Sequence, residues 1–179
     1  MSNRFHLKYL IFLGASFMIF GCSSKSFDKT VDFVDLQRFM GKWYVWAGRT
    51  TFLEKGAHNS VEVYTWNQKE NRIDVDFSFR KNSFDGEVKR LPQKAWIENE
   101  QTKAHWKIQL FWPFKANYLI IGLDRNYEWT AVGVPSGDYL WIMGREPIVS
   151  DEKLSQILKQ VEEGGYPVQD VPRIPQNGE

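Results

Sequence analysis

The 179-residue sequence contains a single cysteine and only three histidines. One cysteine excludes a disulfide within the chain. The Gly-x-Ser-x-Gly, His-Glu-x-x-His and phosphate-loop motifs of common enzyme classes are also absent. The sequence therefore predicts neither an enzyme nor a metal or cofactor site.

The sequence also lacks an excess of either charge. Its formal net charge is +1, and neither sign forms a long run. Nucleic-acid-binding proteins present a strongly basic face, so this balance argues against a nucleic-acid partner. What the chain does contain is 42% apolar and 16% aromatic residues, with eight tryptophans. That is enough for a large core in one domain.

Only one long apolar run occurs, over residues 10–20, and it is too short for a transmembrane helix. Basic residues precede it, which is the pattern of a signal peptide. The run ends at Cys22, and "IFGC" resembles a bacterial lipobox, in which the signal is cut before the cysteine and the cysteine receives lipid. We therefore expect a signal peptide over residues 1–21, a lipidated N-terminus and tether over 22–33, and a folded domain over 34–179.

Lipid on Cys22 would hold the protein at a membrane without a spanning helix. No aspartate follows the cysteine, and in the lipoprotein pattern this implies the outer membrane. The alternative is a soluble secreted protein with a free thiol.

Alternation of apolar and polar residues recurs along the chain after Gly41. In residues 72–80, the clearest case, Ile73, Val75, Phe77 and Phe79 alternate with charged and polar side chains. Eight such segments, separated by short turns, cover residues 43–49, 61–66, 72–80, 87–97, 104–110, 117–123, 127–134 and 139–145. They predict an all-β, up-and-down antiparallel barrel, whose interior is filled by side chains or holds one small ligand.

One helix is predicted after the strands. Ser150 is a suitable N-cap, and apolar residues from Leu154 to Val161 follow at helical spacing until Gly164 and Gly165. This apolar stripe must pack on something, most simply the outer wall of the sheet. The proline-rich tail from Pro167 is expected to be extended.

Three motifs then occur in order: "GKWY" from Gly41, "GLDRNY" from Gly122 and "DYLWIMGR" from Asp138, with the helix behind them. With these motifs, residues 34–171 resemble the lipocalins, and bacterial lipocalins in particular. The resemblance implies an eight-stranded lipocalin barrel with a C-terminal α-helix on its outside, and a lipid ligand. One departure is that Leu123-Asp124 stands where the family has Thr-Asp-Tyr.

Four residues are predicted to close one end of the barrel: Gly41, Trp43, Asp124 and Arg145. In an up-and-down barrel, the start of the first strand, the turn between the sixth and seventh strands and the end of the eighth strand share one end. A guanidinium over an indole ring is favourable by about 0.5–2 kcal/mol. We therefore predict that Arg145 stacks on Trp43 as a structural floor.

The alternation also predicts which side chains point inward. If Arg145 covers the floor, the residues on the same face of its strand line the interior, and the apolar faces of other strands complete the wall. The predicted cavity residues are Ile73, Val75, Phe77, Trp106, Ile108, Leu110, Tyr118, Ile120, Tyr139, Trp141 and Met143. For residues 61–66 the pattern leaves the inward face open. The alternative is that all these positions form a packed core without a cavity.

The loops at the opposite end form the predicted mouth. They mix bulky apolar side chains with cations, and the predicted mouth residues are Phe52, Lys55, Phe84, Trp112, Phe114 and Lys115. Such a rim suits an amphiphile with an anionic head and a fatty tail. Exposed aromatic residues that simply close the barrel are the alternative.

These observations predict a lipid-binding lipocalin, anchored in the outer membrane through Cys22, that stores or transports fatty acids or lysophospholipids. Two alternatives are a structural envelope lipoprotein with a filled barrel, and a tetrapyrrole binder that uses His58 or His105 as axial ligand. The oligomeric state is left open, with a homodimer as one alternative.

Overall fold

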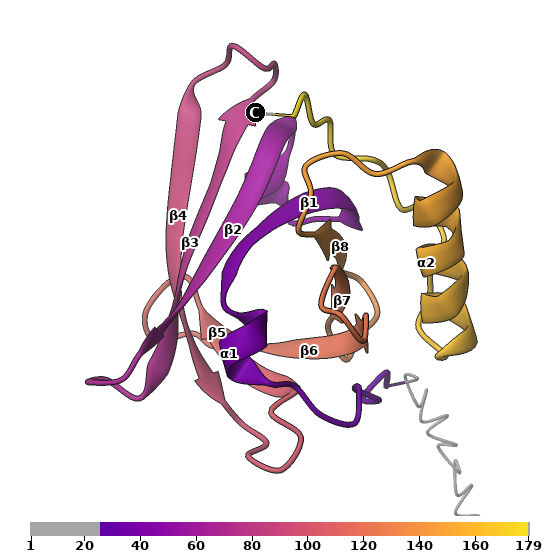
Figure 1. Cartoon of the computed structure of the whole chain (residues 1–179). Coiled ribbons are helices and arrows are strands. Elements are labelled where there is room, and N and C mark those ends of the chain that lie inside the picture. Colours follow the sequence, from indigo (N-terminus) through magenta and orange to yellow (C-terminus); the bar gives the residue numbers. More distant parts are fainter. Residues whose placement is uncertain (1–25, 179) are drawn as a thin grey trace, which may run out of the picture.

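The computed structural model describes residues 26–178, so the predicted signal peptide and Cys22 lie outside the described residues. Eight strands form a closed antiparallel barrel in chain order (Figure 1). They are β1 (Gly41–Arg49), β2 (Ala57–Asn67), β3 (Arg72–Lys81), β4 (Val88–Ile97), β5 (His105–Gln109), β6 (Ala116–Leu123), β7 (Trp129–Gly133) and β8 (Leu140–Gly144). The predicted eight-stranded barrel is confirmed.

The predicted C-terminal helix is confirmed as α2 (Asp151–Glu163), which packs on the outside of the barrel (Figure 1). The Ser150 side chain accepts a hydrogen bond from the Lys153 amide at 3.2 Å and so caps the helix. Leu154, Ile157 and Val161 are buried against the sheet. Two short elements were not predicted: α1 (Leu36–Phe39), which precedes β1, and the 3₁₀ helix η1 (Phe52–Glu54), which follows it.

A bulge in β1 turns Trp46 outward, toward α2. The pairing of β1 with β8 shifts register between Val45 and Ala47, and the Trp46 indole donates a hydrogen bond to the Glu146 carbonyl at 2.8 Å. Its ring lies directly on Gly144, where an added Cβ would stand 1.8 Å from a ring carbon. A glycine is therefore required at position 144, because any side chain would collide with the indole.

The C-terminal tail lies between β1 and β2 beyond Tyr44 and Val61, where the direct pairing of these two strands ends. The backbone amides of Gly48 and Asn59 donate to the Pro172 and Pro175 carbonyls at 2.9 and 2.8 Å. The Gln176 amide nitrogen then bridges the carbonyls of Val45 and Ser60. The tail is extended, as expected, and it satisfies backbone groups that the shortened β1–β2 ladder leaves unpaired.

The floor of the barrel is built around Arg145, as predicted. Its guanidinium lies 3.6 Å from the centre of the Trp43 ring and donates to the carbonyls of Arg38, Phe39 and Lys42. Partial burial lowers the pKa of Arg145 to about 10. Asp124, predicted to join this floor, instead accepts hydrogen bonds from the amides of Asn126 and Glu128 and so shapes the β6–β7 turn.

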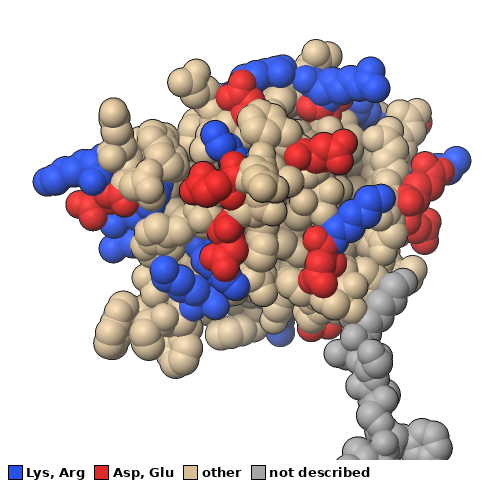
Figure 2. Space-filling model, turned by 90° about the horizontal axis from the view of Figure 1, so that it is seen from below, with Lys and Arg blue, Asp and Glu red and all other residues tan. Residues whose placement is uncertain are grey.

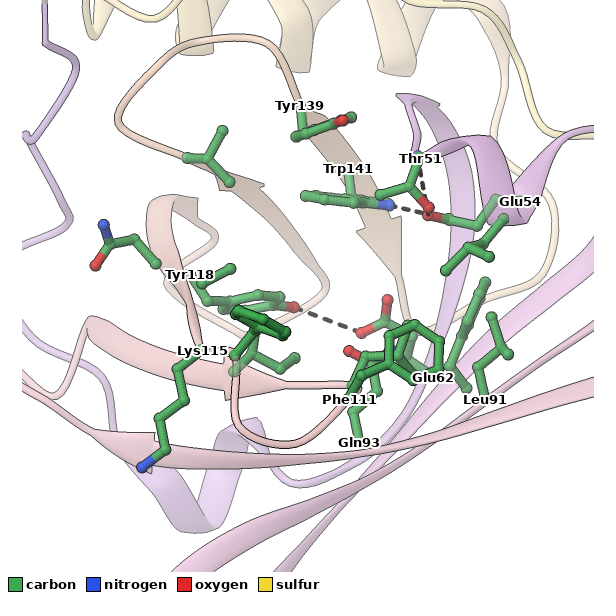
Figure 3. Close-up of a pocket in the computed structure, with 18 residues that line it drawn as sticks. Thr51, Glu54, Glu62, Leu91, Gln93, Phe111, Lys115, Tyr118, Tyr139 and Trp141 are labelled. Atoms are coloured by element: carbon green, nitrogen blue, oxygen red, sulfur yellow. Dashed lines mark hydrogen bonds between the residues drawn. The ribbon is translucent and has the colours of Figure 1, made fainter.

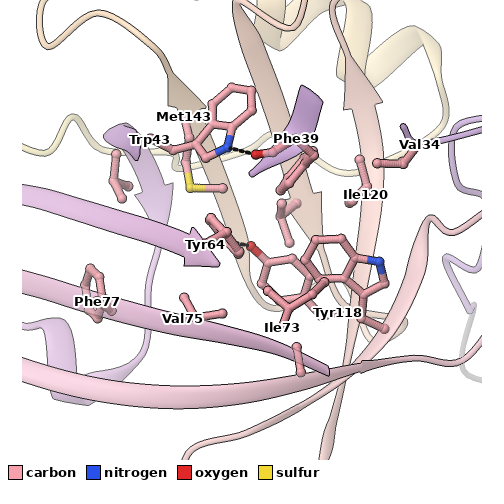
Figure 4. Close-up of a cluster of buried hydrophobic side chains, with 14 of the residues drawn as sticks. Val34, Phe39, Trp43, Tyr64, Ile73, Val75, Phe77, Tyr118, Ile120 and Met143 are labelled. Atoms are coloured by element: carbon pink, nitrogen blue, oxygen red, sulfur yellow. Dashed lines mark hydrogen bonds between the residues drawn. The ribbon is translucent and has the colours of Figure 1, made fainter. Parts of the chain in front are cut away.

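Side chains fill the half of the barrel next to the floor (Figure 4). Phe39, contributed by α1, packs between Trp43, Tyr64 and Trp106, with ring centres 5.1–5.4 Å apart. Seven residues that were predicted to line the cavity are buried in the same core, and all but Phe77 and Tyr118 lie away from the cavity described below. These five are Ile73, Val75, Trp106, Ile120 and Met143. Because α1 inserts Phe39 from the floor end of the barrel, no space is left beside these five residues for a ligand.

The segment before α1 runs along the outside of the barrel. The Phe27 amide donates to the Pro135 carbonyl in the β7–β8 loop, and the Val31 amide donates to the Ile120 carbonyl. Residues 26–33, expected as part of a tether, therefore lie against the sheet. They begin at the mouth end and run toward the floor.

Acidic and basic side chains are interspersed on the face shown in Figure 2. On the outer face of β3, Asp74 pairs with Arg72 and Asp76 pairs with Arg90. These two carboxylates thus serve the surface of the barrel, and such exposed pairs contribute little to stability.

Replacement of Arg145 by Lys tests the floor. Lysine keeps the charge but loses the planar stack on Trp43 and the fixed fork of donors. We expect the free energy of unfolding in urea to fall by about 1–3 kcal/mol. The control is Arg90→Lys in the exposed pair with Asp76, which should change it by less than about 0.5 kcal/mol. Equal losses for both variants would contradict the role of Arg145.

Candidate ligand-binding cavity

A cavity of about 330 Å³ occupies the half of the barrel next to the mouth (Figure 3). Its volume falls at the lower end of the range of small-molecule sites. The wall is mostly apolar and aromatic, and it comes from six of the eight strands, β2 to β6 and β8, and from the loops at the mouth. The lining residues are Thr51, Leu53, Glu54, Glu62, Phe77, Leu91, Gln93, Ile108, Leu110, Phe111, Phe114, Lys115, Ala116, Asn117, Tyr118, Val134, Tyr139 and Trp141.

Six of the eleven predicted cavity residues lie on this wall: Phe77, Ile108, Leu110, Tyr118, Tyr139 and Trp141. The other five belong to the packed core beneath it, as described above. The alternation of side chains along each strand thus indicates which residues point inward. It does not distinguish a residue on a cavity wall from one in a filled core. That distinction depends on α1, whose four residues carry no strong sequence signal.

The inward face of residues 61–66, left open by the sequence, is the one with Glu62 and Tyr64. Both are buried, whereas Val61 and Val63 are only partly buried and Thr65 is exposed. Glu62 was not predicted as a site residue, because a carboxylate at an inward position contradicts the usual alternation. Val61 and Val63 on either side of Glu62 are apolar, so the sequence does not show that Glu62 lies on the inward face.

Glu62 is held by two tyrosine hydroxyls. The Tyr64 hydroxyl donates to Glu62 Oε2, the Tyr118 hydroxyl lies 3.5 Å from the same oxygen, and the two hydroxyls also hydrogen-bond each other. Only 5% of Glu62 is exposed. Burial raises the pKa of Glu62 to about 7, opposed by the Tyr64 hydrogen bond and reinforced by the negative charge of Glu54. Burial likewise raises the pKa values of Tyr64 and Tyr118.

Glu54 is a second buried carboxylate, nearer the mouth. Thr51 donates to its Oε1 from the amide at 3.1 Å and from the hydroxyl at 2.9 Å, and the Trp141 indole donates to Oε2 at 3.1 Å (Figure 3). Burial raises the pKa of Glu54, although these hydrogen bonds oppose the shift. Both oxygens of Glu54 therefore have partners, and this side chain fixes η1 against β8.

The predicted mouth residues divide into two groups. Phe114 and Lys115 line the cavity, whereas Phe52, Lys55, Phe84 and Trp112 do not. Phe52, Trp112 and Phe114 are 83%, 85% and 78% exposed, and Phe84 lies edge-on to His58. The mouth loops thus present a set of exposed aromatic side chains around the opening.

The cations near the mouth do not point into the cavity. Lys115 Nζ lies 3.7 Å from the centre of the Trp96 ring. Arg49 donates to backbone carbonyls of the β7–β8 loop and the C-terminal tail, among them those of Gly137 and Pro167. Lys55 is exposed at the mouth. Within the described residues, the ionisable groups whose charge falls inside the cavity are therefore acidic.

Neither histidine of the described residues lines the cavity. His58 contacts the Gly56 carbonyl, and His105 contacts the Asn117 side chain. Over residues 26–178, no group of three or more histidine, cysteine or acidic residues is arranged to hold a metal ion. The axial ligand that the tetrapyrrole alternative requires is thus not supplied by either histidine.

Comparison with known proteins identifies the family. The family described as "Lipocalin-like domain" matches residues 34–176, which include the whole barrel and α2. The chain belongs to the lipocalin family. Lipocalins are generally binding and transport proteins. Membership therefore supports the binding of a small hydrophobic ligand as the general role of this lipocalin.

The alignments to named relatives extend over most of this lipocalin. It is 30% identical over 157 residues to Outer membrane lipoprotein Blc of Escherichia coli K12, covering 86% of this chain and 88% of that protein. It is 25% identical over 150 residues to Temperature-induced lipocalin-1 of Arabidopsis thaliana, covering 80% of each. The solved structure of insecticyanin from Manduca sexta shares the fold, with a TM-score of 0.63 at 14% identity over 84% of each chain.

Glu62 makes the stability of this lipocalin depend on pH. Its pKa is about 7 in the folded state and near 4.5 in an unfolded chain, so the folded state holds an extra proton between these values. Stability therefore falls as pH rises from about 4.5 to 7, by roughly 3 kcal/mol from this group. We expect Glu62→Gln to abolish this decline, so that the variant gains stability over the wild type at pH 8 relative to pH 5 in urea unfolding.

The exposed Glu98 supplies the control for this prediction. Glu98→Gln should leave the pH dependence of unfolding as in the wild type, because Glu98 is exposed on the β4–β5 loop. A Glu62→Gln variant whose stability differs from the wild type by the same amount at both pH values would contradict the raised pKa.

Proposed function

We propose that this lipocalin binds a single-chain lipid, a fatty acid or lysophospholipid, and stores or carries it at the bacterial outer membrane. The observation that carries the proposal is the apolar-walled cavity of about 330 Å³ beneath a mouth rimmed by exposed aromatic residues. The name of the Escherichia coli relative, Outer membrane lipoprotein Blc, supports the location.

The energetics allow such binding without a specific contact to the head group. Each buried CH2 contributes about 0.8 kcal/mol, so a chain of about sixteen carbons gains roughly 12 kcal/mol in all. Association and ordering take back several kcal/mol. Micromolar affinity follows even where part of the chain stays outside the cavity. The packed lower half of the barrel limits the ligand to one chain.

We further propose that lipid on Cys22 attaches the protein to the membrane. Phe27 lies beside the β7–β8 loop at the mouth end, hydrogen-bonded to Pro135 and packed on Tyr166. The five Cα–Cα steps from Cys22 to Phe27 span at most roughly 18 Å. An anchor there would hold the mouth, with its exposed aromatic side chains, close to the bilayer from which a ligand comes. The homodimer considered from the sequence stays a prediction.

A cavity-filling variant tests the binding site. Ile108 lines the cavity from β5, and its neighbour Gln109 does not. We expect Ile108→Trp to weaken saturable binding of a fluorescent fatty acid by about tenfold or more, since the larger ring occupies the ligand's space. Gln109→Trp is the matched control and should bind as the wild type does. A wild-type protein that shows no saturable binding would instead support the filled barrel.

Replacement of Cys22 by Ser tests the anchor. The wild-type protein should fractionate with the outer membrane and carry fatty acyl groups in mass spectrometry. The Cys22→Ser protein should lose these groups, because a serine offers no thiol for the thioether to the lipid. Unchanged membrane fractionation of this variant would contradict lipid attachment at this residue.

A further inference from the structure

The end of the cavity that faces the floor is polar, although the wall is mostly apolar. Among the residues of β2, which runs from mouth to floor, Glu62 alone lines the cavity. Two positions nearer the floor, Tyr64 packs against Phe39 of α1 in the core. Tyr118 lies across from Glu62, and its ring stacks on the buried Trp106. A chain that enters from the mouth therefore ends at Glu62 and Tyr118.

One oxygen of Glu62 is unused at this end of the cavity. Oε2 accepts from the Tyr64 hydroxyl and lies 3.5 Å from the Tyr118 hydroxyl, whereas Oε1 takes part in none of the hydrogen bonds found among residues 26–178. The described ion pairs do not include Glu62 either. Glu62 is only 5% exposed and lines the cavity, so a further donor to Oε1 has to come from the contents of the cavity.

The groups that face Glu62 offer it no cation. Its register partners on β1 and β3 are Trp43 and Phe77, which are uncharged. The hydroxyls of Tyr64 on β2 and Tyr118 on β6 lie at the other oxygen, and the charge of Glu54 from η1 is of the same sign. A ligand group that reaches this point is therefore the natural donor for Oε1.

We propose that the cavity is selective for a single-chain lipid whose inserted part carries a hydroxyl group, which donates a hydrogen bond to Glu62 Oε1. This inference rests on the proposed function and specifies the ligand class. Its anionic head stays at the mouth, where Lys55 and Lys81 are exposed. Glu62 thus recognises the far end of the lipid chain through a hydrogen bond, inside a site that is otherwise apolar.

Three chemistries at the far end of a chain should be distinguished. A hydroxyl satisfies Oε1, and a hydrogen bond to a charged group is stronger than one between neutral groups. A methyl group displaces water from the carboxylate and returns no hydrogen bond. A second carboxylate places like charges together in a desolvated site, which is the least favourable arrangement.

Calorimetric titration with three probes that differ only at this end tests the proposal. The probes are 12-hydroxydodecanoate, dodecanoate and dodecanedioate, with 16-hydroxyhexadecanoate and hexadecanoate as a longer pair. The wild type should bind the hydroxylated probe about tenfold tighter than the methyl-ended one. It should bind the dicarboxylate at least about a hundredfold weaker than the hydroxylated probe at pH 8.

Two variants separate the role of Glu62 from an effect on folding. Glu62→Leu should reverse the order of the hydroxylated and methyl-ended probes. Glu62→Gln, which keeps a polar group of the same shape, should retain the preference for the hydroxyl and lose the penalty on the dicarboxylate. The dicarboxylate should also bind more weakly as pH rises from 6 to 8 in the wild type, and not in Glu62→Gln. Glu98→Gln should match the wild type throughout.

The outcomes distinguish this proposal from the proposed function. If no probe binds, the lipid-binding function itself fails. If the three wild-type affinities are equal, or if Glu62→Leu keeps the preference for the hydroxyl, lipid binding stands and the anchor at Glu62 is overturned.

Discussion

The guanidinium of Arg145, stacked on the indole of Trp43, joins parts of the chain that are far apart in sequence. Arg145 follows β8 in the chain, yet its guanidinium donates hydrogen bonds to carbonyls of α1 and of the start of β1. The same group stacks on the Trp43 ring. A half-buried cation needs such partners, because it has lost part of its hydration. By holding α1 across the end of the barrel, this contact keeps Phe39 inserted among the core aromatics and sets how deep the interior is filled.

The interior of an eight-stranded barrel is just wide enough for side chains or one small ligand. Here the two outcomes share one barrel. Phe39, Trp43, Tyr64 and Trp106 fill the half next to the floor, and the open half begins where Glu62 and Tyr118 replace apolar side chains. A carboxyl group in this position costs stability above its pKa, so its presence is better explained by what it contacts in a ligand than by what it adds to the fold.

Most strands could be predicted from the sequence because they alternate apolar and polar residues locally, and local alternation is all that a half-buried strand requires. The clearest prediction, around Phe77, differs from the observed β3 by one residue. The helix α2 could be predicted equally well, since its N-cap Ser150 and the apolar stripe that follows are adjacent in the chain. α1 was missed because four residues are too few for periodicity, and Glu62 was missed because its strand has apolar residues on both faces.

The sequence by itself determined the family, the number and order of the strands, the outer helix and the pairing of Trp43 with Arg145, because each of these follows from short motifs or from connections between neighbours. Only the tertiary structure decided where the packed core ends and the cavity begins. That boundary depends on how much volume side chains from α1, β1, β2 and β5 occupy together. It also depends on which carboxylates the closed barrel removes from water, and neither property belongs to any single segment of the chain.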